Sequence, residues 1–158
     1  MTLSNETIFI IVAISAMVAI SMWIQKCRDA GIRRLAEEYM GGRLQRSSAE
    51  FGRIFYPDNA DIAARIRDIF AKHIPLNIDR LEPSDRPVID LKMDDLDSMA
   101  AAEVIVALEK EYGIKIANAD AERMRTFDDI CSHVISKLKE KNVDNKAFHL
   151  TRQSAPPA

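Results

Sequence analysis

Three segments of the chain repeat their apolar residues at the spacing of an amphipathic α-helix. The clearest is "DIAARIRDIFAKHI", residues 61–74, where apolar residues recur three or four positions apart among charged ones. Residues 98–112 and 126–138 show the same period. No stretch of convincing length alternates apolar and polar residues as a half-buried strand does, and the chain holds only 5 glycines and 6 prolines. The sequence therefore predicts an all-α fold.

The apolar faces of these segments predict a small bundle of three major helices and one short one. The second helix is expected to end at Gly113, and the last to begin at Thr126, with Asp129 in the position of a capping box. A short helix is expected in "NADAERM", and the proline-bearing loop before the second helix should fold back onto the core. The second helix is expected to bury one stripe of residues: Met99, Ala102, Ile105, Leu108 and Tyr112.

An uncharged run, Thr7 to Ile24, precedes these segments. As a helix it would extend about 27 Å, which is close to the thickness of the hydrocarbon core of a bilayer. Basic residues follow the run, from Lys26 to Arg34, so the positive-inside rule predicts a single-pass bacterial inner-membrane protein whose C-terminal domain is cytoplasmic. A cleaved signal peptide would need a basic segment before the run, and a buried soluble helix would usually keep a polar stripe.

The expected organisation has four parts. Residues 1–25 would form the transmembrane anchor and 26–57 a basic juxtamembrane connector, which either lies on the membrane surface or packs on the following domain. Residues 58–140 would form the helical domain. The tail, 141–158, has no periodicity and is expected to be disordered.

One serine, Ser98, stands between an acidic turn and the second helix, in "MDDLDSM". A serine there is by itself most simply a helix N-cap. The surrounding acids lack the order and the central glycine of a calcium loop, and the 2 cysteines and 3 histidines show neither metal-binding spacing nor a nucleophile–base arrangement. The sequence therefore indicates neither a catalytic centre nor a metal site.

From Asp97 onward the chain resembles the acyl carrier protein family. "DSM" is similar to the family's Asp-Ser-Leu, "AEVIVALEKEYGIKI" to its second helix, and "NADAERMRTFDDICSHVISKL" to its third and fourth helices. The resemblance covers about half the chain and implies that Ser98 carries a covalent 4'-phosphopantetheine arm. It also implies that Asp97 positions the modifying enzyme and that Met99 is an apolar contact for partner enzymes. Glu103, Glu109 and Glu111 would form an acidic face for basic partners.

Two functions follow from these expectations. The first is a membrane-tethered, non-catalytic carrier that holds acyl or aminoacyl groups as thioesters for fatty-acid, lipid or secondary-metabolite synthesis. Its partners would be a phosphopantetheinyl transferase and acyl-activating, synthase or acyltransferase enzymes with basic docking surfaces, and no nucleic acid. The second is an unmodified, carrier-shaped interaction module that acts as a membrane-anchored adaptor through its acidic face. The mass of the protein after incubation with a competent transferase distinguishes the two.

Overall fold

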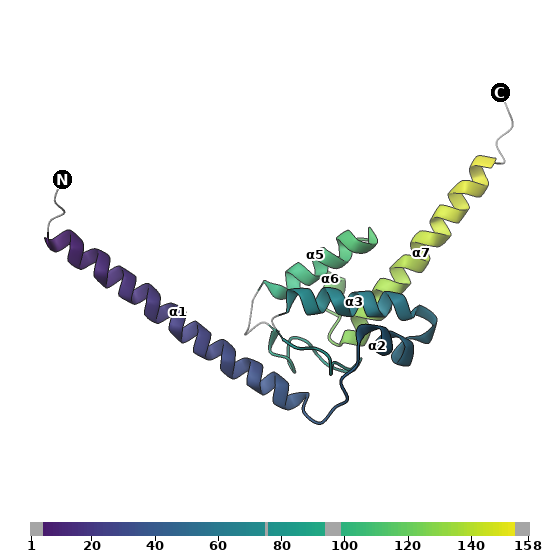
Figure 1. Ribbon diagram of the computed structural model, residues 1–158. Helices are drawn as coiled ribbons and strands as arrows, with labels where there is room; N and C mark the ends of the chain where they lie inside the picture. The colour runs from purple at the N-terminus through teal and green to yellow at the C-terminus, as the bar shows by residue number, and fades with distance from the viewer. Residues whose placement is uncertain (1–4, 75, 94–98, 154–158) are drawn as a thin grey trace.

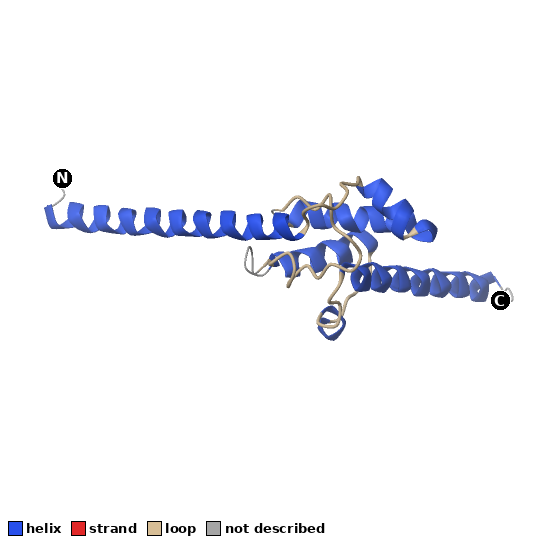
Figure 2. Ribbon diagram, turned by 90° about the horizontal axis from the view of Figure 1, so that it is seen from below, coloured by secondary structure: helices blue, strands red, loops and turns tan. Residues whose placement is uncertain are grey.

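The computed structural model describes residues 5–74, 76–93 and 99–153, and it describes side chains from Ile14 to Val143 outside the two internal gaps. Within these residues the protein is built from helices and loops without a β-strand (Figure 2). In order, the helices are α1 (Asn5–Tyr39), α2 (Ser48–Phe55), the 3-10 turn η1 (Pro57–Asn59), α3 (Ala60–His73), α5 (Ala100–Tyr112), α6 (Asn118–Ala121) and α7 (Phe127–Gln153). The prediction of an all-α fold is confirmed.

The ends of the helices follow local chemistry. Gly42, with a φ of 79°, follows the end of α1, and Gly113, with a φ of 58°, ends α5 in the left-handed conformation that glycine adopts at little cost. Thr126 and Asp129 form the expected reciprocal cap of α7: the Asp129 amide donates to Thr126 Oγ1 at 3.1 Å, and the Thr126 amide donates to Asp129 Oδ2 at 2.8 Å. The hydrogen bonds to the Asp129 carboxylate, chiefly from the Thr126 amide, hold its pKa below the usual range.

Helix α2 lies in the segment that was expected to be a connector. A capping box starts it, since Ser47 Oγ accepts from the Glu50 amide at 3.3 Å and the Ser47 amide donates to the Glu50 carboxylate at 2.9 Å. The helix packs across α3 and buries Phe51 completely. The Phe51 ring meets the Phe127 ring edge-on, with 5.5 Å between ring centroids. This segment therefore packs on the helical domain, which was one of the two expected alternatives.

The core forms where α2, α3, α5 and α7 meet and is closed by the loop before α5. Three apolar residues of that loop, Ile78, Leu81 and Leu91, are buried as expected, whereas Val88 and Ile89 are exposed. Two long helices project from this body in different directions, α1 at the N-terminal side and α7 at the C-terminal side (Figure 1). Helix α7 continues to Gln153, well into the tail that was expected to lack structure.

The buried stripe of α5 differs from the expected one. Ala100, Val104 and Leu108 are buried, whereas Met99 is 60% exposed and Ala102 is also exposed. The expected stripe was wrong at its N-terminal end, because Met99 and Ala102 line an open groove between α3 and α5 and are not packed in the core. A periodic pattern defines which residues share a face, but three alanines in a row leave the direction of that face open.

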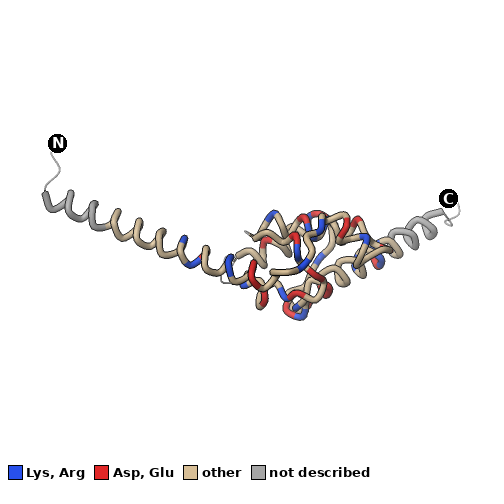
Figure 3. Tube along the Cα trace, turned by 60° about the horizontal axis from the view of Figure 1, so that its bottom comes forward, with Lys and Arg blue, Asp and Glu red and all other residues tan. Residues whose placement is uncertain are grey.

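The expected membrane localisation is contradicted. Among the residues that the structure describes, no helix is both long and apolar enough to span a bilayer, so the N-terminal anchor is not supported. The second half of α1 carries charged residues of both signs (Figure 3).

The contact between α2 and the start of α3 predicts a strong effect at Gly52. A Cβ atom on Gly52 would lie 2.1 Å from the carbonyl oxygen of Ala60, which belongs to the backbone and cannot move aside without shifting α3. We expect Gly52→Ala to lower the free energy of unfolding by about 1–3 kcal/mol or more, the usual range for overpacking. Urea denaturation followed by circular dichroism measures the change.

Gly31→Ala is the matched control for Gly52→Ala. Gly31 also lies inside a helix, but a Cβ atom there would have nothing within 4 Å. Because alanine favours the helix over glycine by up to about 1 kcal/mol, this variant should be unchanged or slightly more stable. Equal destabilisation of both variants would show that the Gly52 contact is not the cause.

Candidate functional site

The segment expected to carry the site, residues 94–98, lies outside the described residues, and so do Ser98 and Asp97. The structure describes what stands on either side of it. Met93 is buried at the end of the preceding loop, and Met99 leads directly into α5 at Ala100. Position 98 therefore precedes the N-terminus of a 13-residue helix, where free backbone N–H groups and the helix dipole favour a negatively charged group.

An apolar cavity of about 560 Å³ opens beside the N-terminal half of α5. Its walls come from the loop before α5, from α5 itself and from the α6 region. Glu109, Glu122 and Arg125 contribute the charged groups among its lining residues. The volume falls in the range of small-molecule sites, and an apolar lining favours an apolar ligand. The apolar lining includes Val88, Met93, Val104, Ile105, Ile116 and Met124.

A second groove of about 800 Å³ lies between α3 and α5. Its apolar lining includes Met99, Ala102 and Val106, and Met99 and Val106 are each 60% exposed. Charged residues of both signs line the rest of the groove, including Lys72 and Lys110. The exposed side of α5 beside the expected site thus combines apolar and charged groups.

The structure does not bring the three expected partner-binding glutamates onto one face. Glu103 and Glu111 line the groove between α3 and α5, whereas Glu109 lines the apolar cavity. Glu109 is also engaged locally: its Oε1 accepts from the Ile116 amide at 2.9 Å, and Lys115 Nζ lies 3.6 Å from its Oε2. This carboxylate therefore holds the chain as it leaves α5.

Glu103 and Glu111 each pair with a residue of α3. His73 Nδ1 lies 3.4 Å from Glu103 Oε2, and Arg65 Nε donates to Glu111 Oε1 at 2.7 Å. The hydrogen bond from Arg65 holds the pKa of Glu111 below its usual range. The Arg65–Glu111 pair is exposed and the His73–Glu103 pair is partly exposed, so both are weak and can exchange for contacts with a partner.

The two cysteines are not equivalent. Cys27 is exposed on α1, whereas Cys131 is buried in α7. Burial raises the pKa of the Cys131 thiol to about 12, so it stays protonated and inert at neutral pH. Among the described residues, no group of three or more His, Cys, Asp or Glu side chains is arranged to hold a metal ion.

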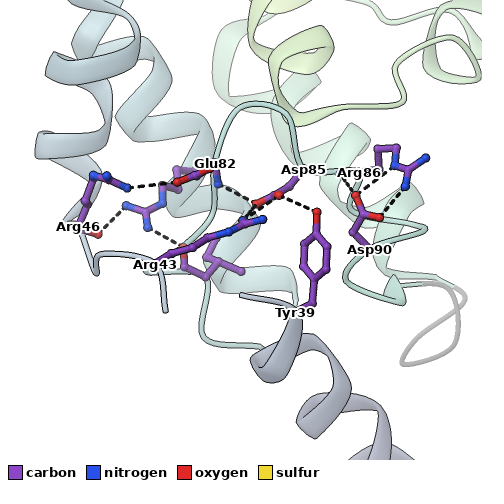
Figure 4. A network of polar contacts seen from close by, with 9 residues as sticks. Tyr39, Arg43, Arg46, Glu82, Asp85, Arg86 and Asp90 are labelled. Carbon is purple, nitrogen blue, oxygen red and sulfur yellow. Dashed lines mark hydrogen bonds and ion pairs between the residues drawn. The ribbon is translucent and has the colours of Figure 1, made fainter. Parts of the chain in front are cut away.

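A network of polar contacts around Asp85 was not anticipated. Asp85, in the loop before α5, is fully buried and contacts Tyr39 and Arg43 from the end of α1 and just beyond it (Figure 4). Nothing in "EPSDRPVID" distinguishes Asp85 from the neighbouring acids, so no sequence signal identifies it. The capping box that starts α2, by contrast, is visible in the sequence as Ser-x-x-Glu before an apolar residue.

Comparison with known proteins agrees with this geometry. Residues 64–134 match the family model described as "Phosphopantetheine attachment site". The chain is also 28% identical over 81 residues to an acyl carrier protein of Thermosynechococcus vestitus, an alignment that covers 51% of this chain and 96% of that protein.

The matched part of the chain is thus similar to a carrier domain of the phosphopantetheine-binding class. Such a domain is not an enzyme; other enzymes modify it, and its cofactor is 4'-phosphopantetheine. The residues present fit that group, because α5 begins at Ala100, two positions after Ser98 in the sequence, and an apolar cavity opens beside the N-terminal half of α5.

Proposed function

We propose that Ser98 carries the 4'-phosphopantetheine arm and that the protein holds acyl or aminoacyl groups as thioesters on the terminal thiol. Ser98 lies inside the matched segment and precedes the first residue of α5 by two positions. The observation that supports an acyl cargo most strongly is the apolar cavity, whose lining includes Met93 and Ala101 on either side of this position. The cavity would offer an acyl chain on such an arm an apolar surface.

Loading of the arm is a phosphoryl-group transfer carried out by a separate enzyme. The hydroxyl oxygen of Ser98 bonds to the phosphorus of the phosphopantetheine group of coenzyme A, and the anhydride bond to the adenosine bisphosphate breaks. The hydroxyl proton is released, and the leaving group takes the electron pair of the broken bond. The product is a phosphodiester whose negative charge would stand near the positive end of the α5 dipole.

Partner enzymes would dock on the exposed side of α5. Asp97 would position the transferase, and Met99 and Val106 would supply apolar contacts beside the arm. Glu103 and Glu111 would exchange their pairs with α3 for basic groups of the partner, because exposed ion pairs contribute only about 0–1 kcal/mol. Such a carrier would serve fatty-acid, lipid or secondary-metabolite synthesis.

Intact mass spectrometry of the full-length protein tests the attachment. After incubation with coenzyme A and a broad-specificity phosphopantetheinyl transferase, the wild-type protein should gain the mass of one phosphopantetheine. Ser98→Ala should gain nothing. Ser132→Ala is the matched control, because Ser132 is an exposed serine of α7 within the same matched segment, and it should be modified like the wild type.

Two outcomes would contradict the proposal. A mass gain that persists in Ser98→Ala would place the arm on another residue. A wild-type protein that stays unmodified beside a positive-control carrier would favour the alternative of an unmodified interaction module.

A further inference from the structure

Asp85 is a buried carboxylate that four donor interactions surround. Arg43 Nη1 donates to both of its oxygens, at 2.9 Å to Oδ1 and 2.7 Å to Oδ2. Tyr39 Oη donates to Oδ1 at 3.2 Å, and the Glu82 amide donates to Oδ2 at 2.8 Å. The Asp85 side chain is completely inaccessible to solvent, whereas that of Arg43 is 22% exposed. Since a buried charge is costly unless it is paired and hydrogen-bonded, the conformation of this loop depends on Arg43.

The backbone around Asp85 joins three parts of the domain. The Asp85 amide donates to the Glu82 carbonyl at 3.1 Å, and the Glu82 amide donates to the Asp85 side chain. Together these two hydrogen bonds close a turn. The Asp85 carbonyl accepts from the Phe127 amide at 2.9 Å, and the Pro83 carbonyl accepts from the Asp128 amide at 2.8 Å. These bonds satisfy amides at the start of α7, so the turn is fastened to α7 on one side and to the α1 region on the other.

The same loop leads from this turn to the proposed attachment segment. Arg86 and Asp90 form an ion pair, with 2.8 Å between Nη2 and Oδ1, and the Asp90 amide donates to the Arg86 carbonyl at 2.7 Å. The Met93 amide then donates to the Pro87 carbonyl at 3.2 Å. Figure 4 shows the two acids in succession, Asp85 against the end of α1 and Asp90 against Arg86. Because Asp85 and Arg86 are neighbours in the sequence, these contacts follow one another along the loop from Asp85 to Met93.

We propose that Asp85 is a positioning residue through which the α1 region holds residues 81–93 in the conformation that presents the attachment segment to the modifying enzyme. This inference rests on the proposed attachment at Ser98. Arg43 and Tyr39 lie outside the 64–134 segment matched by the carrier family, so a part of the chain beyond the carrier domain contributes to its modification.

The expected kinetic effect is specific. When only a fraction of the molecules has the competent conformation, the apparent affinity falls by that fraction. Weakening the Asp85 contacts should therefore raise the KM of the transferase for this carrier and leave kcat unchanged, since a bound carrier has already adopted the required conformation. A fall of the competent fraction to about one tenth would raise KM about tenfold.

The test compares Asp85→Asn with Asp79→Asn in the full-length protein. Asparagine at position 85 keeps the shape of the side chain but removes the charge that Arg43 pairs with, and it replaces one of the two acceptor oxygens by an NH2 donor. Asp79 lies in the same loop with an exposed side chain, so its variant controls for the loss of one carboxylate. Tyr39→Phe, which removes one hydrogen bond and keeps the ion pair, should raise KM in the same direction but by less.

Two measurements on each variant complete the test: transferase kinetics with the carrier varied, and amide hydrogen exchange of the apo protein. For Asp85→Asn we expect about tenfold higher KM, unchanged kcat, and faster exchange at Asp90 and Met93, with α3 and the start of α7 still protected. Equal KM and exchange in all proteins would overturn the inference. Exchange that rises equally in α3 would also overturn it, because Asp85 would then stabilise the whole fold only.

The two proposals fail in different ways. If the wild type is never modified, the attachment proposal fails, while the exchange data still report whether Asp85 controls residues 86–93. If the wild type is modified at Ser98 and Asp85→Asn behaves like Asp79→Asn, the attachment proposal stands and the positioning role is excluded.

Discussion

A fragment that begins at Asp58 is expected to lose the cooperative fold that the full-length protein has. Such a fragment removes α2 and with it Phe51, which is completely buried against Phe127 and within the cluster that also includes Phe70. Removing a buried phenylalanine side chain alone costs about 3–5 kcal/mol, while a small domain has only about 5–15 kcal/mol in total. Circular dichroism and urea denaturation of the fragment measure the loss.

The fragment also removes groups that satisfy Arg67 in α3. This arginine is 1% exposed, donates through Nη1 to the Arg46 carbonyl at 2.7 Å and stacks on the Phe51 ring at 5.0 Å from its centroid. Burial lowers the pKa of its guanidinium, which reflects the cost of holding this charge away from water. Without the Arg46 carbonyl and the Phe51 ring, the guanidinium of Arg67 loses one hydrogen bond and one ring contact that offset the free-energy cost of burying its charge.

Matched variants in the full-length chain separate packing from chain length. Phe51→Ala should lower the free energy of unfolding by about 3–5 kcal/mol, whereas Ile54→Ala in the same helix should change it little, because Ile54 is 59% exposed. A fragment that begins at Arg33 keeps Ala36, Met40 and α2 and should unfold cooperatively. A stable, cooperative fragment from Asp58 would show that α2 is dispensable.

Replacing Arg43 by methionine is the second substitution with a large expected effect. The change leaves the Asp85 carboxylate buried without its ion-pair partner, and breaking a buried pair in this way costs about 3–5 kcal/mol. Urea denaturation of Arg43→Met should therefore show a large fall in the midpoint, with little change in the slope.

Two comparisons make this expectation specific to the buried pair. Arg65→Met removes the exposed pair with Glu111 and should cost no more than about 1 kcal/mol. The double variant Arg43→Met with Asp85→Asn removes the uncompensated charge as well, so it should recover part of the stability that Arg43→Met loses. If Arg43→Met and Arg65→Met were equally stable, the Asp85 contact would not contribute to the fold as the structure indicates.

The sequence alone identifies the elements that depend on local rules. The periodicity of residues 61–74 and the cap formed by Thr126 and Asp129 appear in the structure as α3 and the start of α7. Gly113 ends α5 in the left-handed conformation, which glycine adopts easily because it has no side chain. The resemblance of residues from Asp97 onward to acyl carrier proteins agrees with the family match over 64–134.

Local rules do not identify contacts between distant segments. The capping box of α2 is a local signal. The burial of Phe51, however, depends on α3 and α7, against which its ring packs. The buried state of Asp85 depends on Arg43, 42 residues earlier in the chain. Likewise, three glutamates share α5 but do not line the same site. Glu109 lines the apolar cavity, whereas Glu103 and Glu111 line the groove between α3 and α5.

Periodicity and caps thus determine α3, α5, the start of α7 and the end of α5, because each follows from residues at most a few positions apart, and the class of carrier domain is indicated by the resemblance of residues from Asp97 onward. Which side of α5 is buried, where the glutamates point and how the α1 region joins the loop before α5 follow only from packing. The physical reason is that a buried side chain or charge is stable only when partners from other elements surround it, and no short stretch of sequence contains those partners.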